Sequence, residues 1–369
     1  MRPHKIGWYH HTLKMPSNNR VVIAAAGNGK TTKIVDQALS STERTVLLTY
    51  TRNNVGEIES KLYSKSASIP PNVTITSWYS FLLHELVRPY RNAIYPHRID
   101  SIAWIQGQSA LKVPEAQLSR HYFAKPGVIY SDKLAKFICV LESATNGKLL
   151  NRLAQRFDHI IIDEIQDMAG YDLEIIELLL KSNITLTMVG DHRQSTYVTN
   201  NSAKNSRFQG LKIIDKFKYW QQKKLLNLVY DNDSYRCSQV IANLADSIFP
   251  EENKTLSKNL ETTEHDGIFM ISKSRLEEYM IQYAPQVLRF SKTTDSLGYS
   301  ALNFGESKGL TFNRVIIFPN GKATSWIKSG EIKHIAASAA KLYVATTRAR
   351  FSVAFLYDGD FKLPDAVRW

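Results

Sequence analysis

A glycine-containing loop between an apolar run and a helix-like run constrains this chain more than any other feature. The apolar residues 21–25 lead into the segment AAAGNGKT, which ends at Thr31, and a helix-like run covers residues 32–39. Glycines let the backbone curl around an anion, and the free N–H groups at a helix N-terminus attract phosphate oxygens. The order of strand, loop and helix therefore predicts an α/β fold with a phosphate-binding loop.

The side chains of this loop fit a nucleotide and its metal ion. We expect Lys30 to reach the β- and γ-phosphates of ATP and Thr31 to place its hydroxyl on Mg²⁺. Ala24 is the one departure, because it stands where the usual pattern has its first glycine. The residues expected to hold the nucleotide are Ala26, Gly27, Asn28, Gly29, Lys30, Thr31 and Thr32.

A pair of carboxylates follows a second apolar run at residues 160–162. Asp163 and Glu164 come at the carboxyl end of an expected strand, where α/β sheets bind their ligands. Successive side chains of a strand point to opposite sides, so the two acids have different tasks. We expect Asp163 to hold Mg²⁺ through water and Glu164 to orient and deprotonate the attacking water. A solvated acidic turn is the alternative for this pair taken alone.

Short apolar runs alternate with helix-like segments in both halves of the chain, which predicts two parallel-sheet domains. We expect the first domain at residues 1–205, with a helical insertion at about 82–156, and the second at 206–369. The polar stretch 199–207 is the expected linker. Candidate strands lie at residues 21–25, 45–50, 73–76, 159–163 and 185–190 of the first domain and at 225–228, 267–271, 314–318 and 351–357 of the second.

Composition favours a polyanionic partner. The formal net charge is +13 and the pI is about 9.5, which suits nucleic acid, although scattered lysines also fit a basic solvated surface. Two distant cysteines, Cys139 and Cys237, exclude a disulfide framework and fit a reducing cytoplasm. No run of about 18 apolar residues occurs and the first residues lack a signal-peptide core, so neither membrane insertion nor secretion is expected.

Further segments in the same order make the chain resemble the UvrD/PcrA/Rep family of superfamily-1 helicases. The resemblance extends over nearly the whole chain, and that family also tolerates alanine at the position of Ala24. The matching segments are TYTRN at 49–53, TSWYSF at 76–81, DEIQD at 163–167, GDHRQSTY at 190–197, SYR at 234–236, SKGL at 307–310 and YVATTRA at 343–349.

The resemblance implies two RecA-like domains that bind ATP and Mg²⁺ in the cleft between them and move along DNA, single-stranded or tailed. Gln194 is the implied sensor of the γ-phosphate, and Arg236 and Arg348 are the implied arginines that reach it from the second domain. A planar, permanently charged guanidinium suits that role. The implied contacts with nucleic acid are Tyr50, Thr51, Arg52, Asn53, Trp78, Tyr197 and Lys308.

The chain departs from the family at four points. About 70 residues separate Arg236 from Lys308, where large members insert a whole domain. The segment after Tyr197 lacks the family's aromatic platform for a DNA base, and the run NFGE replaces a Thr-x-His run. The glutamine that reads adenine has no counterpart before the loop, although Trp8 or Tyr9 could stack on the base.

Three functions fit these residues. The first is an ATP-dependent DNA translocase or helicase. The second is an NTPase switch that senses nucleic acid without processive unwinding and works with a nuclease or another protein of a repair or antiphage-defence complex, as in Gabija systems. The third is a catalytically dead scaffold, which the intact Lys30, Asp163 and Glu164 argue against.

Overall fold

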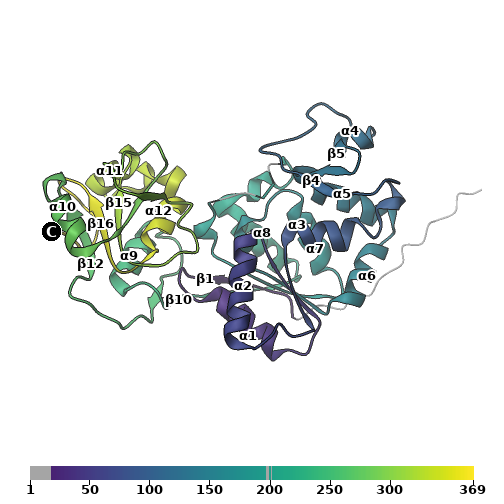
Figure 1. The fold of residues 1–369 in the computed structure, drawn as a ribbon, viewed down its shortest axis with the longest axis horizontal. Coiled ribbons are helices and arrows are strands. Elements are labelled where there is room, and N and C mark those ends of the chain that lie inside the picture. The colour runs from purple at the N-terminus through teal and green to yellow at the C-terminus, as the bar shows by residue number, and fades with distance from the viewer. Residues whose placement is uncertain (1–17, 197–198, 201) are drawn as a thin grey trace, which may run out of the picture.

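The computed structural model describes residues 18–196, 199–200 and 202–369. They form two α/β bodies that lie end to end, the first in purple to teal and the second in green to yellow (Figure 1). The sheet of the first body has six parallel strands in the order β3-β2-β7-β8-β1-β9. Their bounds are β1 Arg20–Ala24, β2 Thr45–Thr49, β3 Val73–Ser77, β7 His159–Ile162, β8 Thr185–Gly190 and β9 Asn227–Asp231.

Both faces of this sheet are covered, as the continuous apolar strands require. Leu47 and Ile161 pack on one side against the helices α1 (Lys30–Ser40) and α2 (Arg52–Lys65). Val46 and Ile160 point to the other side and join the largest core cluster. The helices that supply that second side include α3 (Trp78–Phe81), α5 (Ser131–Ala144), α7 (Asp172–Leu180) and α8 (Ile213–Gln222).

Two sequence-based boundaries are wrong. The strand expected at 225–228 in the second domain is β9, which pairs with β1 in the first sheet, and Phe217 of α8 packs in the first core. The expected linker at 199–207 begins inside the first body, because Thr199 is buried and its hydroxyl donates to Asp172 at 2.7 Å. We propose that the boundary between the bodies follows Asp231, before β10 (Asp233–Ser234), which pairs with β11 (Leu256–Ser257).

The second body is built on another six-stranded parallel sheet, in the order β14-β13-β15-β16-β12-β17. The strands are β12 Gly267–Ile271, β13 Gln286–Arg289, β14 Ala301–Asn303, β15 Phe312–Phe318, β16 Ala349–Leu356 and β17 Ala366–Arg368. Its helices are α9 Gln239–Ser247, α10 Leu276–Tyr283, α11 Gly321–Ser329 and α12 Ala339–Thr346. The expected α/β class with two parallel sheets is therefore confirmed, although β13, β14 and β17 were not among the predicted strands.

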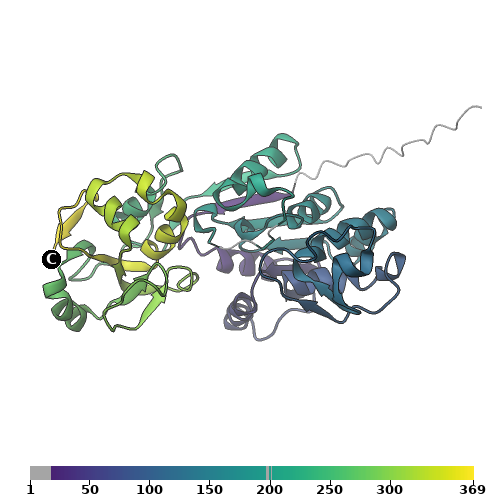
Figure 2. The same cartoon turned by 90° about the horizontal axis from the view of Figure 1, so that it is seen from above.

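The insertion in the first body is more than helical. It contains α4 (Leu118–Tyr122), α5 and α6 (Lys148–Arg156), but also a small sheet of β4 (Ser101–Ala103), β5 (Phe123–Lys125) and β6 (Val128–Tyr130). Both views show this part beside the first sheet and away from the second body (Figures 1 and 2). Among the described residues, no helix is long and apolar enough to cross a membrane.

Candidate nucleotide site between the two bodies

The phosphate-binding loop has the backbone that its glycines predict. Gly27 and Gly29 have φ angles of 77° and 79°, in the left-handed region that favours glycine, and Gly29 caps α1. A Cβ on Gly27 would lie 2.5 Å from Cβ of Arg236 and 2.9 Å from Oγ of Ser234. Gly27 is thus required twice, by its backbone angle and by the close approach of the segment after β9.

That segment is hydrogen-bonded to the loop along its length. Oγ of Ser234 donates to the carbonyl of Ala26 at 2.6 Å, and the N–H of Tyr235 donates to the carbonyl of Gly27 at 2.9 Å. Nδ2 of Asn28 donates to the carbonyl of Asp233 at 2.8 Å. These bonds place Arg236 beside the phosphate loop.

The two carboxylates lie at the carboxyl end of β7, next to this loop. Asp163 is buried, and its Oδ2 accepts a hydrogen bond of 3.1 Å from Oγ1 of Thr31. Glu164 has a φ of 57°, which is rare for a residue with a side chain and concentrates at functional sites. The two residues predicted to hold the metal, Thr31 and Asp163, are therefore neighbours. At Glu164 the backbone leaves the extended conformation of β7. No group of three or more metal-ligating side chains occurs in the described ranges.

Lys308 comes from the second body and contacts these acids. Its Nζ lies 3.1 Å from Oε2 of Glu164 and 2.8 Å from Oδ2 of Asp167. Burial alone would raise the pKa of Glu164, but Lys308 and Lys30 outweigh it and lower that pKa to about 2. Lys308 was predicted as a nucleic-acid contact, and in the structure it pairs with Glu164 and Asp167.

Gln194 and Arg348 meet across the two bodies. Gln194 lies on the short helix η4 (His192–Gln194) after β8, and its Oε1 accepts a hydrogen bond of 3.1 Å from Nη2 of Arg348. Arg348 is only 1% exposed, and its Nε also donates to the carbonyl of Val344 at 3.0 Å. The sensor glutamine and the arginine that the sequence placed in different domains are therefore direct neighbours.

Three cations lie buried in this site, beside the carboxylates described above. Burial lowers the pKa of Lys30, although Glu164 and Asp191 oppose the shift. Burial also lowers the pKa of Arg236, and burial followed by the charge of Arg236 lowers the pKa of Arg348 to about 9. Because desolvated cations that repel one another gain from an anion, the site favours a polyanionic ligand.

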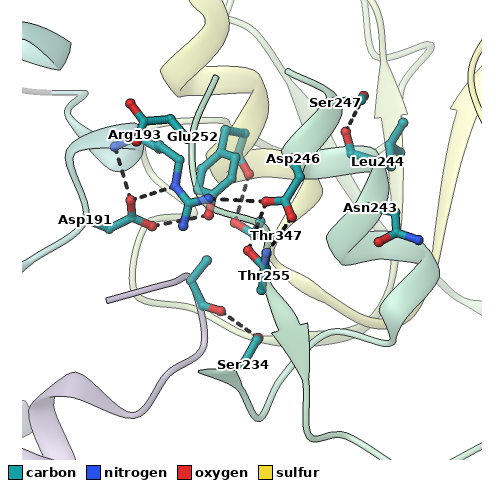
Figure 3. A network of polar contacts seen from close by, with 12 residues as sticks. Asp191, Arg193, Ser234, Asn243, Leu244, Asp246, Ser247, Glu252, Thr255 and Thr347 are labelled. Carbon is teal, nitrogen blue, oxygen red and sulfur yellow. Dashed lines mark hydrogen bonds and ion pairs between the residues drawn. The ribbon is translucent and has the colours of Figure 1, made fainter. Parts of the chain in front are cut away.

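A buried polar network joins the bodies next to Gln194. Arg193 of η4 lies between two carboxylates, Asp191 of the first body and Asp246 of α9 (Figure 3). Its guanidinium also lies 4.8 Å from the ring centre of Tyr343. Asp191 in turn accepts from Nε2 of Gln194 at 3.0 Å. The network therefore fixes the side chain of Gln194, the predicted sensor, through Asp191.

The residues predicted to contact nucleic acid differ in burial and in position. Trp78 is a core residue and the prediction is wrong: it is fully buried, and its Nε1 donates to Asp172 at 3.0 Å. Thr51 caps α2, and Arg52 and Asn53 begin that helix with exposed side chains. Tyr50 and Asn53 line a cavity of about 450 Å³ that also reaches Lys308. Tyr197, Trp8 and Tyr9 lie outside the described residues.

Comparison with known proteins finds a family likeness in part of the chain. Residues 116–212, which include the carboxylate box and Gln194, match the UvrD/REP helicase N-terminal domain. The chain is similar to UvrD-like helicases over these residues. It is 33% identical over 119 residues to the "Probable DNA helicase II homolog" of Mycoplasma genitalium, which is 32% of this chain and 16% of the relative. The protein of the same name from Mycoplasma pneumoniae is 32% identical over 119 residues, or 32% of this chain and 15% of that relative.

The chain thus matches only a small part of the length of these curated relatives. Among solved structures, the helicase nonstructural protein 10 of an arterivirus is 14% identical with a TM-score of 0.48, covering 94% of this chain and 61% of that one.

Sequence reasoning missed one residue beside the loop. Tyr235 is 56% exposed, and Nζ of Lys33 lies 5.8 Å from the centre of its ring. Its neighbour Arg236 was singled out from the same SYR segment, but nothing in three letters shows that the tyrosine ring stays open to solvent next to the phosphate loop.

Proposed function

We propose that this chain is an ATP-dependent nucleic-acid motor that hydrolyses ATP between its two RecA-like bodies and acts on single-stranded or tailed DNA. The observation that carries the proposal is that two arginines of the second body reach the first: Arg236 lies against Gly27 of the glycine loop, and Arg348 donates to Gln194. A site assembled from two bodies responds to its ligand by closing or opening, which is how binding is coupled to movement.

The donor set fits ATP with Mg²⁺. The loop backbone from Gly27 to Thr32 and the side chain of Lys30 would hold the phosphates, and Thr31 and Asp163 would hold the metal. Bound in this way, Mg·ATP supplies a phosphoryl group that is transferred to water. The exposed ring of Tyr235 offers a flat surface for the base, in place of the glutamine that the sequence lacks.

Glu164 is the proposed base, and Lys308 controls it. A carboxylate whose pKa is about 2 is ionised but has little affinity for a proton, so it abstracts one poorly. Withdrawal of Lys308 removes the main charge that depresses this pKa. Movement of the second body that loosens this pair therefore prepares Glu164 to accept a proton.

DNA is the proposed track. The net charge of +13 attracts a polyanion, and the exposed start of α2 places Arg52 and Asn53 at the mouth of the cavity that leads to Glu164. A guanidinium is well suited to a backbone phosphate. The two cysteines are both free, which agrees with a reducing compartment such as the cytoplasm.

A second candidate is an NTPase switch without processive unwinding, partnered by a nuclease or another protein of a repair or antiphage-defence complex. One observation favours this candidate. Between α9 and the SKGL segment, the described chain holds only the strands β11 to β14 and one α-helix, α10. No separate domain is inserted at this point within the described chain.

Two measurements separate these functions. ATP hydrolysis is followed with and without a dT oligonucleotide, and strand displacement is followed on a tailed duplex. A motor hydrolyses faster with the single strand and displaces the partner strand; the switch shows stimulated hydrolysis alone. Affinity for the oligonucleotide should fall with salt at a log–log slope of about −0.7 per phosphate contacted. Absence of hydrolysis in both conditions would refute both candidates.

A further inference from the structure

One described tryptophan is mostly exposed. Trp104, directly after β4, is 67% exposed, whereas Trp78, Trp220 and Trp326 are at most 1% exposed. Single apolar residues on a surface are ordinary, so this exposure gains meaning only from where the ring lies. Its surroundings on the insertion are therefore decisive.

The loop that carries Trp104 is tied to the start of α5. The N–H of Ile105 donates to Oγ of Ser131 at 3.0 Å. Further along, the N–H and the hydroxyl of Ser109 donate to Asp132 at 2.9 Å and 2.6 Å. Asp132 is 8% exposed, so these bonds are sheltered from water. The indole is thus presented from a pinned loop, which lowers the entropy lost when it binds a partner.

Trp104 is the outer end of a row of aromatic rings. Its ring centre lies 4.8 Å from that of Tyr79 at an interplanar angle of 78°, and Tyr79 lies 5.8 Å from Tyr50. The hydroxyl of Tyr79 donates to the carbonyl of Thr199 at 3.0 Å, which fixes the middle of the row. Tyr50 lines the cavity shared with Asn53 and Lys308. The row therefore connects the exposed face of the insertion with the cleft between the bodies.

We propose that Trp104 stacks on an unpaired base of a single strand that crosses the first body along this row. The inference rests on the proposed function and adds the residue that would distinguish single strands from duplex. A planar apolar ring is matched by the face of a base, and only an unpaired base offers that face. The net positive charge of the chain and the exposed Arg52, two residues after Tyr50, would attract the backbone phosphates of the same strand.

The test compares Trp104→Ala and Trp104→Phe with the unmodified chain, using a fluorescent dT oligonucleotide and a blunt duplex. Alanine should weaken binding of the oligonucleotide by about five- to 150-fold, and phenylalanine should keep most of it. Duplex affinity should change by less than about twofold, because a duplex presents no free base face. Tyr63→Ala is the matched control, since Tyr63 is also exposed, at 57%, on α2 of the same body.

Intrinsic fluorescence gives a second readout. The oligonucleotide should quench the emission of the unmodified chain, and Trp104→Phe should lose most of that quenching while Trp78 and Trp220 remain buried. Unchanged oligonucleotide affinity of Trp104→Ala, or an equal loss for single strand and duplex, would overturn the stacking role and leave the motor intact. If the unmodified chain binds no single strand at any salt concentration, the proposed function itself fails.

Discussion

Arg193 of the first body and Asp246 of the second form an ion pair, with Nη1 3.2 Å from Oδ1. Both side chains are buried, with exposed fractions of 4% and 2%. Nε of Arg193 also lies 3.1 Å from Oδ1 of Asp191, so one guanidinium holds a carboxylate from each body. The pair links η4, which bears Gln194, to α9 of the second body.

Arg193→Met should destabilise the chain strongly. Methionine is similar in length to arginine but carries no charge, so Asp191 and Asp246 stay buried without their shared cation. Breaking a buried pair in this way costs about 3 to 5 kcal/mol. Equilibrium unfolding in urea measures the loss. Lys61→Ala is the control, because its pair with Glu57 is partly exposed and contributes at most about 1 kcal/mol. Similar losses in the two variants would show that the buried network adjusts to the missing charge.

Asp172 should make the stability of the chain fall as pH rises from about 4 to 6. Burial raises its pKa to about 6, above its ordinary value of 3.8, although hydrogen bonds from Trp78 and Thr199 oppose the shift. The folded state then binds a proton that the unfolded state has lost, so the protonated carboxyl is favourable at low pH. This contribution disappears as pH rises through the folded pKa, by up to about 3 kcal/mol.

Asp172→Asn isolates that effect, because the amide does not titrate. The free energy of unfolding of the unmodified chain, minus that of the variant, should decrease between pH 4 and pH 6 and then stay constant. A difference that is flat over the whole range would contradict the raised pKa of Asp172.

Lys30→Ala and Glu164→Gln should fail in different ways. Without Lys30 the phosphates lose a direct counter-charge, so nucleotide affinity and hydrolysis both fall. Glutamine at position 164 keeps the shape of the side chain but cannot accept a proton, so ATP still binds and hydrolysis stops. Binding of a fluorescent ATP analogue and release of phosphate separate the two. Hydrolysis by Glu164→Gln near the unmodified rate would assign the base to another residue.

Features set by residues close together in the chain could be predicted from the sequence, whereas features set by distant residues could not. The phosphate loop and Asp163 were predictable because strand, turn and helix within a few residues fix their geometry. Trp78 was not, because its burial depends on Asp172, which lies far along the chain and accepts its N–H. The same holds for β9, whose place beside β1 depends on pairing with residues about 200 positions earlier in the chain. Trp104 left no pattern at all, since exposure on a pinned loop depends on Ser131 and Asp132.

Arg348→Ala should lower the rate of hydrolysis by about 10³ or more while nucleotide affinity changes much less. The reason is its position: Nη2 of Arg348 donates to Gln194 of the opposite body, the residue that we propose senses the γ-phosphate. Lysine should rescue poorly. The guanidinium also donates from Nε to Val344 and from Nη1 to Leu310, at 3.0 and 3.3 Å, and an ammonium cannot replace this fork.

Single-turnover hydrolysis at saturating ATP, Mg²⁺ and single strand decides the role of Arg348. Melting temperatures of the alanine and lysine variants are measured in parallel, because Arg348 is buried and its loss also affects packing. If Arg348 were only structural, the folded fraction of each variant would hydrolyse ATP within about threefold of the unmodified rate, far from the effect of a missing arginine finger. That outcome would remove the second body from the chemistry and, with it, the coupling of hydrolysis to movement between the bodies.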